Sequence, residues 1–265
     1  RIVWHAVSPV EKPVVQVVPW HPSPKFGEEA KTYDCAPVVL ADLSTDSKSS
    51  FYEVELTGLA PETTYGYRVG DGTLWSEWHR FRTAAQDAQP FRFIYLGDVQ
   101  NDILSLGART LREAYASCSD ARMMVFAGDL VAEGYDDLLW EEFTDALGYI
   151  PAWIPVFSVP GNHDAHRPGT EEIAGPHDLY RAHFMFPDNG PQGLETLEEA
   201  AFYVDFQGVR FIALDGNVFA NGDYLPAIRE QAKEAQVEWL QGVLKNNPCL
   251  WTIVVVHQPL FSAGK

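Results

Sequence analysis

Apolar and polar residues alternate in short runs over the first part of the chain. Runs that read as strands lie at 13–18, 51–56, 64–69 and 79–83, with turn-forming residues between them. No stretch in this part carries the 3.6-residue apolar period of an amphipathic helix. A series of short strands without helices is typical of a small β-sandwich. We therefore predict an all-β sandwich over residues 1–84.

The pattern changes after residues 85–90, a small polar stretch that ends in proline and is predicted to be a linker. From residue 91 to 265, strand-like apolar runs alternate with helical patterns. Strands are expected at 91–96, 123–127, 155–159 and 251–256, and two more, joined at Gln207-Gly208, within 201–214. Helices are expected at 102–118, with Asp102 as N-cap, and at 136–148 and 230–246. This alternation predicts an α/β fold with helices packed over the sheet.

Charge and composition restrict the function. A formal net charge of −18 argues against a nucleic-acid-binding surface, because such surfaces neutralise phosphates with lysine and arginine. The longest strongly apolar run, at 251–256, is too short to span a membrane. Cys35, Cys118 and Cys249 form neither a disulfide framework nor a metal-ligand spacing, and we expect small buried residues. A phosphorylated substrate would need positive charge from metal ions.

Polar side chains follow four of the predicted strands. In chain order they are Asp98 and Gln100, then Asp129, then Asn162, His163 and Asp164 in a single turn, and finally His257. Strands of an open α/β sheet end at a shared edge, so these side chains should converge there. Gly97, Gly128 and Gly161 precede three of the groups and would let the backbone turn sharply and approach a bound group closely.

Carboxylate, amide and imidazole donors without thiolate suit Fe, Mn or Zn, with Mg²⁺ less favoured. Asp129, on a central strand, is the candidate to bridge two ions. A single Gly-Asp after a strand is more often an ordinary turn, and a single histidine there is more often a core residue. The repetition of such groups after four strands favours a metal site.

These motifs carry a family resemblance. Their order and flanks, above all "GDL" at 128–130 and "VPGNHD" at 159–164, resemble the calcineurin-like metallophosphoesterases. The segment 56–69, with Tyr65 in the tyrosine-corner position, resembles a fibronectin type III domain. Together they resemble purple acid phosphatases and their bacterial relatives. The resemblance implies an α/β metallophosphoesterase domain after a fibronectin-like sandwich, which we expect to lack its first strand here.

The resemblance also implies roles for the residues. Asp98 would bind the first metal, Asp129 both metals, and Asn162 and His257 the second. His163 would contact phosphoryl oxygens or protonate the leaving group. The remaining two side chains lie beside this set: Asp164 would orient His163, and Gln100 would ligate weakly through its carbonyl oxygen or act from outside the ligand set.

The implied reaction is the hydrolysis of a small phosphorylated substrate by a hydroxide that bridges two metal ions. A phosphomonoester is favoured, and a phosphodiester stays open. By analogy the protein would be extracellular or periplasmic, and the sequence leaves its oligomeric state open. A different class also stays open, a non-catalytic binding or adhesion protein with a degenerate metal site.

The sequence departs from the family pattern at three places. Gln100 replaces the histidine of Asp-x-His. Ala132 stands where purple phosphatases place a metal-binding tyrosine, and Tyr135 is not expected to replace it, so we expect a colourless or differently metallated enzyme. The last family motif, Gly-His-x-His, is not in the printed sequence, and we expect it beyond Lys265.

Other tempting residues are expected to have ordinary roles. His166, His177 and His183 lie in a Pro/Gly-rich stretch predicted to be a loop over the site, as surface histidines, with His166 able to reach the substrate. Asp215 is expected to form a turn. The tryptophans of the first half could form a carbohydrate- or partner-binding face, but sandwich core or domain interface is favoured; they are Trp4, Trp20, Trp75 and Trp78.

Overall fold

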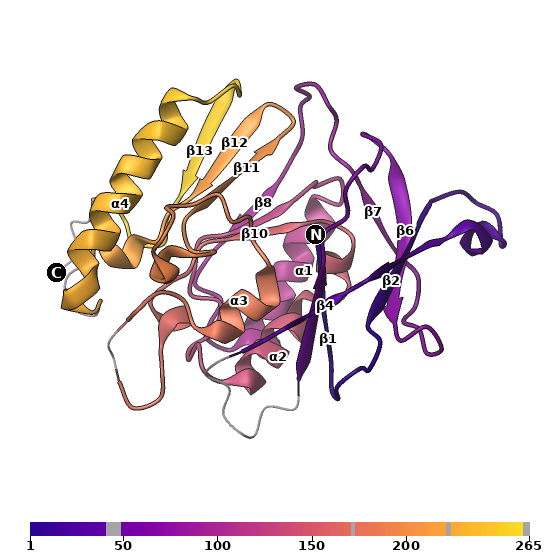
Figure 1. The fold of residues 1–265 in the computed structure, drawn as a ribbon, viewed down its shortest axis with the longest axis horizontal. Helices are drawn as coiled ribbons and strands as arrows, with labels where there is room; N and C mark the ends of the chain where they lie inside the picture. The colour runs from indigo at the N-terminus through magenta and orange to yellow at the C-terminus, as the bar shows by residue number, and fades with distance from the viewer. Residues whose placement is uncertain (41–48, 171–172, 221–223, 262–265) are drawn as a thin grey trace.

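The computed structural model describes residues 1–40, 49–170, 173–220 and 224–261. Figure 1 shows the early strands on one side of the molecule and the later α/β part on the other. The early strands form two antiparallel sheets, ordered β1-β5-β4 and β3-β2-β6-β7. Their bounds are β1 Ile2–Ala6, β2 Val14–Pro19, β3 Lys31–Asp34, β4 Ala36–Val38, β5 Ser50–Val54, β6 Thr64–Gly70 and β7 His79–Arg82. The predicted sandwich is confirmed.

Alternation along these strands builds the sandwich core. Val15 and Val17 on β2 are buried with Tyr52 of the facing sheet. The hydroxyl of Tyr65 accepts a hydrogen bond from the backbone N–H of Ala60 at 2.9 Å, which is the contact expected of a tyrosine corner. Trp4 packs on Tyr52 with 4.6 Å between ring centroids, so for this tryptophan the core interpretation is confirmed.

The α/β part contains two further sheets. One is parallel and ordered β10-β9-β8; the other is ordered β11-β12-β13, with β11 antiparallel to β12. The strands are β8 Ile94–Leu96, β9 Met124–Phe126, β10 Val156–Ser158, β11 Phe202–Phe206, β12 Val209–Ala213 and β13 Trp251–Val255. The helices are α1 Ala108–Ser117, α2 Asp137–Leu147, α3 Asp178–Phe184 and α4 Pro226–Lys245.

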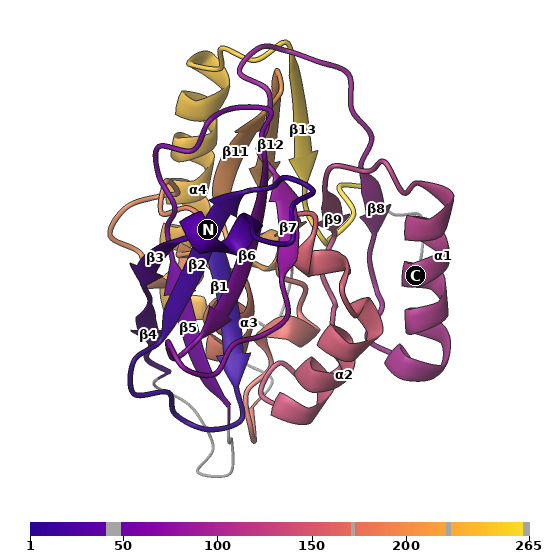
Figure 2. The same ribbon diagram turned by 90° about the vertical axis from the view of Figure 1, so that its right-hand side faces the viewer.

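These elements form layers. Phe157 of β10 contacts Phe211 of β12 with 5.8 Å between ring centroids, so the two sheets face each other across an apolar core. Helices α1 and α2 lie beside β8 and β9, whereas α4 lies against β11–β13, as Figures 1 and 2 show from two directions. Val243 of α4 packs with Ile212 of β12 on the outer face of that sheet. The predicted arrangement of sheet layers flanked by helices is confirmed.

Three details differ from the sequence prediction. Asp102 does not cap a helix: it is left-handed (φ 53°), and its carbonyl oxygen, not its side chain, accepts the N–H groups of Leu106 and Gly107. A short π-helix, Ile103–Gly107, therefore precedes α1. Helix α4 begins four residues before the predicted start, at a proline that suits a first helical turn. Helix α3 lies in a stretch predicted to be a loop.

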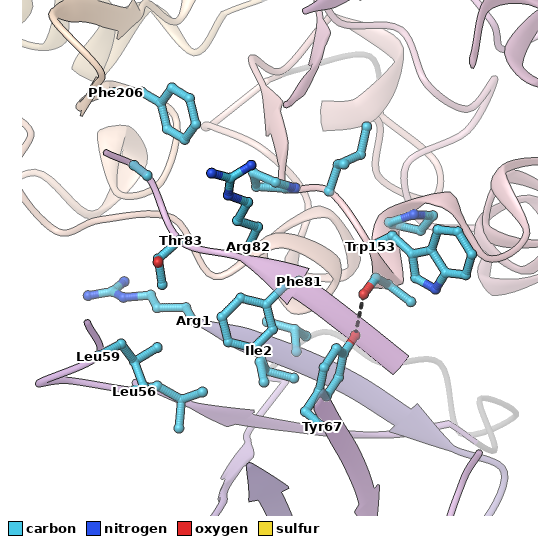
Figure 3. Close-up of a pocket in the computed structure, with 16 residues that line it drawn as sticks. Arg1, Ile2, Leu56, Leu59, Tyr67, Phe81, Arg82, Thr83, Trp153 and Phe206 are labelled. Carbon is cyan, nitrogen blue, oxygen red and sulfur yellow. Dashed lines mark hydrogen bonds between the residues drawn. The ribbon is translucent and has the colours of Figure 1, made fainter. Parts of the chain in front are cut away.

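The sandwich and the α/β part are joined by direct contacts. Tyr67 of β6 donates a hydrogen bond to the carbonyl oxygen of Ala152 at 3.0 Å (Figure 3). Arg122, just before β9, donates to the carbonyl oxygen of Thr83 at 3.1 Å. Among the described residues, no helix is long and apolar enough to cross a membrane.

Candidate metal centre

Three side chains with metal-binding chemistry meet at one edge of the sheets. Asp98 follows β8, Asp129 follows β9 and His257 follows β13, and each offers a ligand atom within 4.8 Å of the other two. The backbone N–H of Asp98 donates to the carbonyl oxygen of Gly128 at 3.1 Å, which ties the first two loops together. The ring of His257 is fixed by a 2.7 Å hydrogen bond to the carbonyl oxygen of Ala127. The expected convergence at the strand ends is thus found for these three residues.

The backbone at this edge is tightly constrained. Asp98 and Asp129 both adopt left-handed conformations, with φ of 54° and 53°, a region that residues with a side chain adopt uncommonly. Gly161 approaches so closely that a Cβ atom there would lie 2.0 Å from Oδ1 of Asp129. At Gly128, φ is 86° and a Cβ atom would lie 2.7 Å from the Gly161 nitrogen. Gly128 and Gly161 therefore allow the two loops to pack against each other and against Asp129.

Asp129 is the most connected of these groups. Its Oδ1 accepts the backbone N–H of His163 at 3.0 Å, and its Oδ2 lies 3.3 Å from Nε2 of His257. Burial raises the pKa of Asp129, but the hydrogen bond and charge of His257 outweigh this, so the net pKa is lowered. Burial lowers the pKa of His257, but the hydrogen bond and charge of Asp129 outweigh this and raise the pKa to about 9. A cation bound between these groups would take the place of that proton.

Gln100 adds an amide to the centre. Its Nε2 donates to Oδ2 of Asp129 at 3.1 Å. Its Oε1 is buried and has no hydrogen-bond partner among the described residues. A buried carbonyl oxygen without a partner is costly unless something else, such as a cation, satisfies it. With two carboxylates and an imidazole close by, this donor set fits a divalent or trivalent ion.

Asp164 holds the "GNHD" turn in place through backbone hydrogen bonds. Asp164 is fully buried, and its carboxylate accepts backbone N–H groups of Leu130 (2.8 Å), Val131 (3.3 Å) and Gly161 (2.9 Å). It therefore fastens the turn to the loop after β9 and does not hydrogen-bond to the ring of His163. Burial raises the pKa of Asp164 to about 6.

His163 is oriented by the backbone. Its Nδ1 donates to the carbonyl oxygen of Ala132 at 2.7 Å, so this carbonyl holds the ring. Asn162 lies between Gly161 and His163, both of which approach Asp129, and it is half-buried. The Asn162 amide has no hydrogen-bond partner within the described ranges. Its role as a ligand, like the other roles, stays a prediction.

The neighbouring histidines divide into two kinds. The ring of His166 lies 4.6 Å from that of His163 between centroids, and its Nδ1 lies 3.1 Å from a carboxylate oxygen of Glu133. His177 and His183 were expected at the surface, and this is wrong. His177 is 1% exposed and accepts the N–H of Leu179 at the start of α3. His183, on α3, has a buried Nε2 and stacks on Trp140 at 5.0 Å between centroids.

The sequence prediction missed a polar support behind the turn. Asn217 donates from Nδ2 to the carbonyl oxygen of Gly161 at 3.2 Å, and its Oδ1 accepts Nε2 of Gln258 at 2.5 Å. Asp215 accepts the N–H of Asn217 at 3.0 Å, which confirms its turn role. Asn217 and Gln258 both follow strands, as the predicted ligands do. The strand-end pattern that identified the candidate ligands could therefore have identified Asn217 and Gln258 as well.

Comparisons with known proteins follow the same division of the chain. Residues 1–83 match the N-terminal domain of purple acid phosphatases, and residues 91–265 match the calcineurin-like phosphoesterase family. Acid phosphatase type 7 of Danio rerio is 31% identical over 140 residues, covering 51% of this chain and 29% of that protein. Purple acid phosphatase 15 of Arabidopsis thaliana is 24% identical over 242 residues, covering 80% of this chain and 42% of that protein. The chain thus spans less than half the length of these curated relatives.

Solved structures show the same fold. The purple acid phosphatase PPD1 from yellow lupin (Lupinus luteus) seeds superposes with a TM-score of 0.70 at 18% identity, covering 95% of this chain and 47% of that one. PhoD superposes with a TM-score of 0.59 at 13% identity, covering 93% of this chain and 55% of that one.

Proposed function

The chain belongs to the calcineurin-like phosphoesterase family, and from this premise we propose that it hydrolyses phosphate esters at the edge where Asp98, Asp129 and His257 converge. Small phosphomonoesters are the proposed substrates. The observation that carries the proposal is the meeting of these three side chains within 4.8 Å, although they follow three different strands. An acidic, imidazole-containing cluster in a chain of net charge −18 needs bound cations to attract a phosphate.

Two ions of Fe, Mn or Zn are the proposed cofactors. Asp98, Asp129 and His257 would hold them, together with the side-chain oxygens of Asn162 and Gln100. The unsatisfied Oε1 of Gln100 supports its inclusion. When bound, such ions supply positive charge to the phosphoryl oxygens and lower the pKa of water.

His163 is the proposed proton-handling group. The carbonyl oxygen of Ala132 accepts from Nδ1, so the proton on that nitrogen is fixed and Nε2 is left to face substrate. From Nε2 the imidazole can contact a phosphoryl oxygen or pass a proton to the leaving oxygen. Asp164 acts on the same step indirectly, because its three backbone hydrogen bonds hold the turn that carries His163.

The first test is the metal content of protein purified without chelator, measured by elemental analysis together with hydrolysis of p-nitrophenyl phosphate. We expect about two ions per chain and activity that is lost on chelation and restored by Mn²⁺, Fe or Zn²⁺. Fewer than about one ion per chain, even after incubation with each metal, would favour the non-catalytic binding protein. Activity on bis(p-nitrophenyl) phosphate that exceeds activity on the monoester would favour the phosphodiesterase.

An extracellular or periplasmic location is also proposed, by analogy with purple acid phosphatases and their bacterial relatives. Fractionation of cells that express the complete gene, followed by immunoblotting, tests it. Recovery of the protein in the cytoplasmic fraction alone would contradict it.

A further inference from the structure

A cavity lies at the opposite edge of the β10-β9-β8 sheet. There the residues that precede β9 and β10 face strand β7 of the sandwich. The cavity has a volume of about 600 Å³, and its walls include Arg80, Arg82, Arg122, Tyr115, Tyr149 and Trp153. We call it the arginine–aromatic cleft. A smaller cavity of about 350 Å³, drawn in Figure 3, shares Arg82 and Trp153 with it.

The three arginines reach the cleft from both parts of the molecule. Figure 3 shows Arg82 and Phe81 on opposite faces of β7, and strand alternation puts Arg80 on the same face as Arg82. Arg122 comes from the segment before β9, where its Nη2 donates to the carbonyl oxygens of Thr83 (3.1 Å) and Arg82 (3.4 Å). Domain packing therefore brings three guanidinium groups to one place.

Their positive charge is poorly balanced. Within the described part of the chain, neither Arg80 nor Arg122 takes part in an ion pair. Arg82 pairs with Glu62 at 3.5 Å, and both side chains are about half exposed. Burial and the like charge of Arg82 lower the pKa of Arg122, and the charge of Glu62 offsets only part of this. The one acidic residue that lines the cleft, Asp120, is paired with Arg92 at 3.4 Å.

This grouping is unusual for the chain as a whole, which has 19 lysines and arginines against 37 acidic residues. Clustered cations repel one another, and a bound anion relieves that repulsion. Guanidinium groups are well suited to phosphate, because their N–H donors match its oxygens in pairs.

The other wall of the cleft is aromatic. The guanidinium of Arg80 lies over the ring of Trp153 at 4.8 Å from its centroid. Tyr149 lies 4.8 Å from Trp153 between centroids, and Tyr115 lies 6.2 Å from Tyr149. Tyr149 is 54% exposed, so part of this wall faces the open cleft. Aromatic walls of this kind favour a planar ring, and the cavity volume is in the range of small-molecule sites.

We propose that the arginine–aromatic cleft is a second binding site, for a small phosphorylated molecule that carries a planar ring. The phosphate would lie against the three arginines and the ring against the aromatic wall. This inference does not depend on the proposed hydrolysis, since the cleft lies at the other edge of the sheet from Asp129. A ligand there could be held while a substrate occupies the metal centre.

The test is isothermal titration calorimetry of the metal-loaded protein with the phosphonate analogue of AMP, in which a P–C bond resists ester hydrolysis. We expect two binding events in the wild type, one at each edge. In the double variant Arg80→Gln/Arg122→Gln, the affinity of the cleft for the analogue should be at least about tenfold weaker. The control Arg109→Gln/Lys233→Gln removes the same charge outside the cleft and should keep both events.

Adenosine and inorganic phosphate are titrated in the same way as comparison ligands. Each should bind the cleft at least about tenfold more weakly than the analogue, because each makes only part of the contacts. Phosphate that binds the cleft as tightly as the analogue would overturn the planar-ring ligand. Two unchanged binding events in Arg80→Gln/Arg122→Gln would overturn the site itself.

Hydrogen exchange of the wild-type protein gives a second measurement that needs no variant to fold. The analogue should slow exchange in segments 79–83, 115–122 and 149–155, in addition to the loops at 97–100, 128–132 and 161–164. Slowed exchange in the second set alone would refute the proposal.

Discussion

The two edges of the β10-β9-β8 sheet differ in charge and in how they are built. The carboxyl-terminal edge gathers Asp98, Asp129 and His257 on loops held by backbone hydrogen bonds and close glycine contacts. The amino-terminal edge gathers Arg80, Arg82 and other groups whose placement depends on packing between the sandwich and the α/β part. Local chain geometry therefore specifies the first edge, whereas the domain interface specifies the second. Mutations should separate these two origins.

The largest effect is expected from Asp129→Asn. The change removes the carboxylate charge that pairs with His257 and would bind both metals. We expect kcat/KM for p-nitrophenyl phosphate to fall at least about 100-fold and metal content to fall with it. Steady-state kinetics and elemental analysis measure both. Binding of the AMP phosphonate in the cleft at the other edge should be retained.

Asp102→Asn is the matched control, because Asp102 is also left-handed but exposed and outside the cluster. Its kcat/KM should stay within about twofold of the wild-type value. If both variants lost activity equally, loop strain and not metal binding would explain the loss.

Gly161→Ala tests whether close backbone packing specifies the carboxyl-terminal edge. A Cβ atom at this position would lie 2.0 Å from Oδ1 and 2.4 Å from the backbone nitrogen of Asp129. We expect a loss of about 1–3 kcal/mol in the free energy of unfolding, measured by urea denaturation, together with reduced activity. Gly242→Ala, on α4 with no atom within 4 Å of the added carbon, should be neutral or stabilising by about 0.5–1 kcal/mol. Equal losses in both variants would show that the close approach at Asp129 has no special role.

The same distinction explains what could be predicted from sequence. The candidate ligands at the carboxyl-terminal edge each follow a strand within a few residues, so strand prediction was sufficient to bring Asp98, Asp129 and His257 together. The arginines share no motif, since Arg80 and Arg122 come from different domains and meet only after these pack. The backbone contacts of Asp164 could not be predicted, because the sequence does not show which backbone N–H groups will lie near a buried carboxylate.

The wrong prediction that two histidines lie at the surface has a similar cause. His177 and His183 lie in a Pro/Gly-rich stretch that reads as a surface loop. In the structure, α3 forms within that stretch, and β1 and Trp140 of α2 cover it. Burial that depends on elements distant in sequence leaves no local signal, whereas the tyrosine corner at Tyr65 does, because its hydrogen bond spans only five residues.

Asp215→Asn tests a buried acid that supports the carboxyl-terminal edge. Asp215 is fully buried, burial raises its pKa to about 7, and its Oδ2 has no hydrogen-bond partner in the described ranges. The folded state thus holds a proton that the unfolded chain releases near pH 4, so Asp215 should make stability fall as pH rises from about 4 to 7. The variant lacks this loss, so its stability relative to wild type should rise by about 4 kcal/mol between pH 4 and pH 8. Urea denaturation at the two pH values measures it.

Asp205→Asn provides a control of opposite sign. The hydrogen bond from Arg210 lowers the pKa of Asp205, so the stability that this pair contributes is present above the unfolded pKa and lost as pH falls. The stability of the variant relative to wild type should therefore be lower at pH 8 than at acid pH. The same direction of change in both variants would contradict the assigned cause.

The smallest effect is expected from Glu62→Gln at the arginine edge. Glu62 is the carboxylate paired with Arg82, and this half-exposed pair should contribute less than about 1 kcal/mol to stability. If the cleft attracts anions through unbalanced arginine charge, removal of Glu62 should tighten AMP phosphonate binding roughly twofold at low salt, with the gain reduced at high salt. Glu230→Gln, which breaks the Lys233 pair on α4, should leave that affinity unchanged. Weaker binding in Glu62→Gln would mean that Glu62 positions Arg82 more than it neutralises it, and the charge difference between the two edges would then not be what draws the ligand.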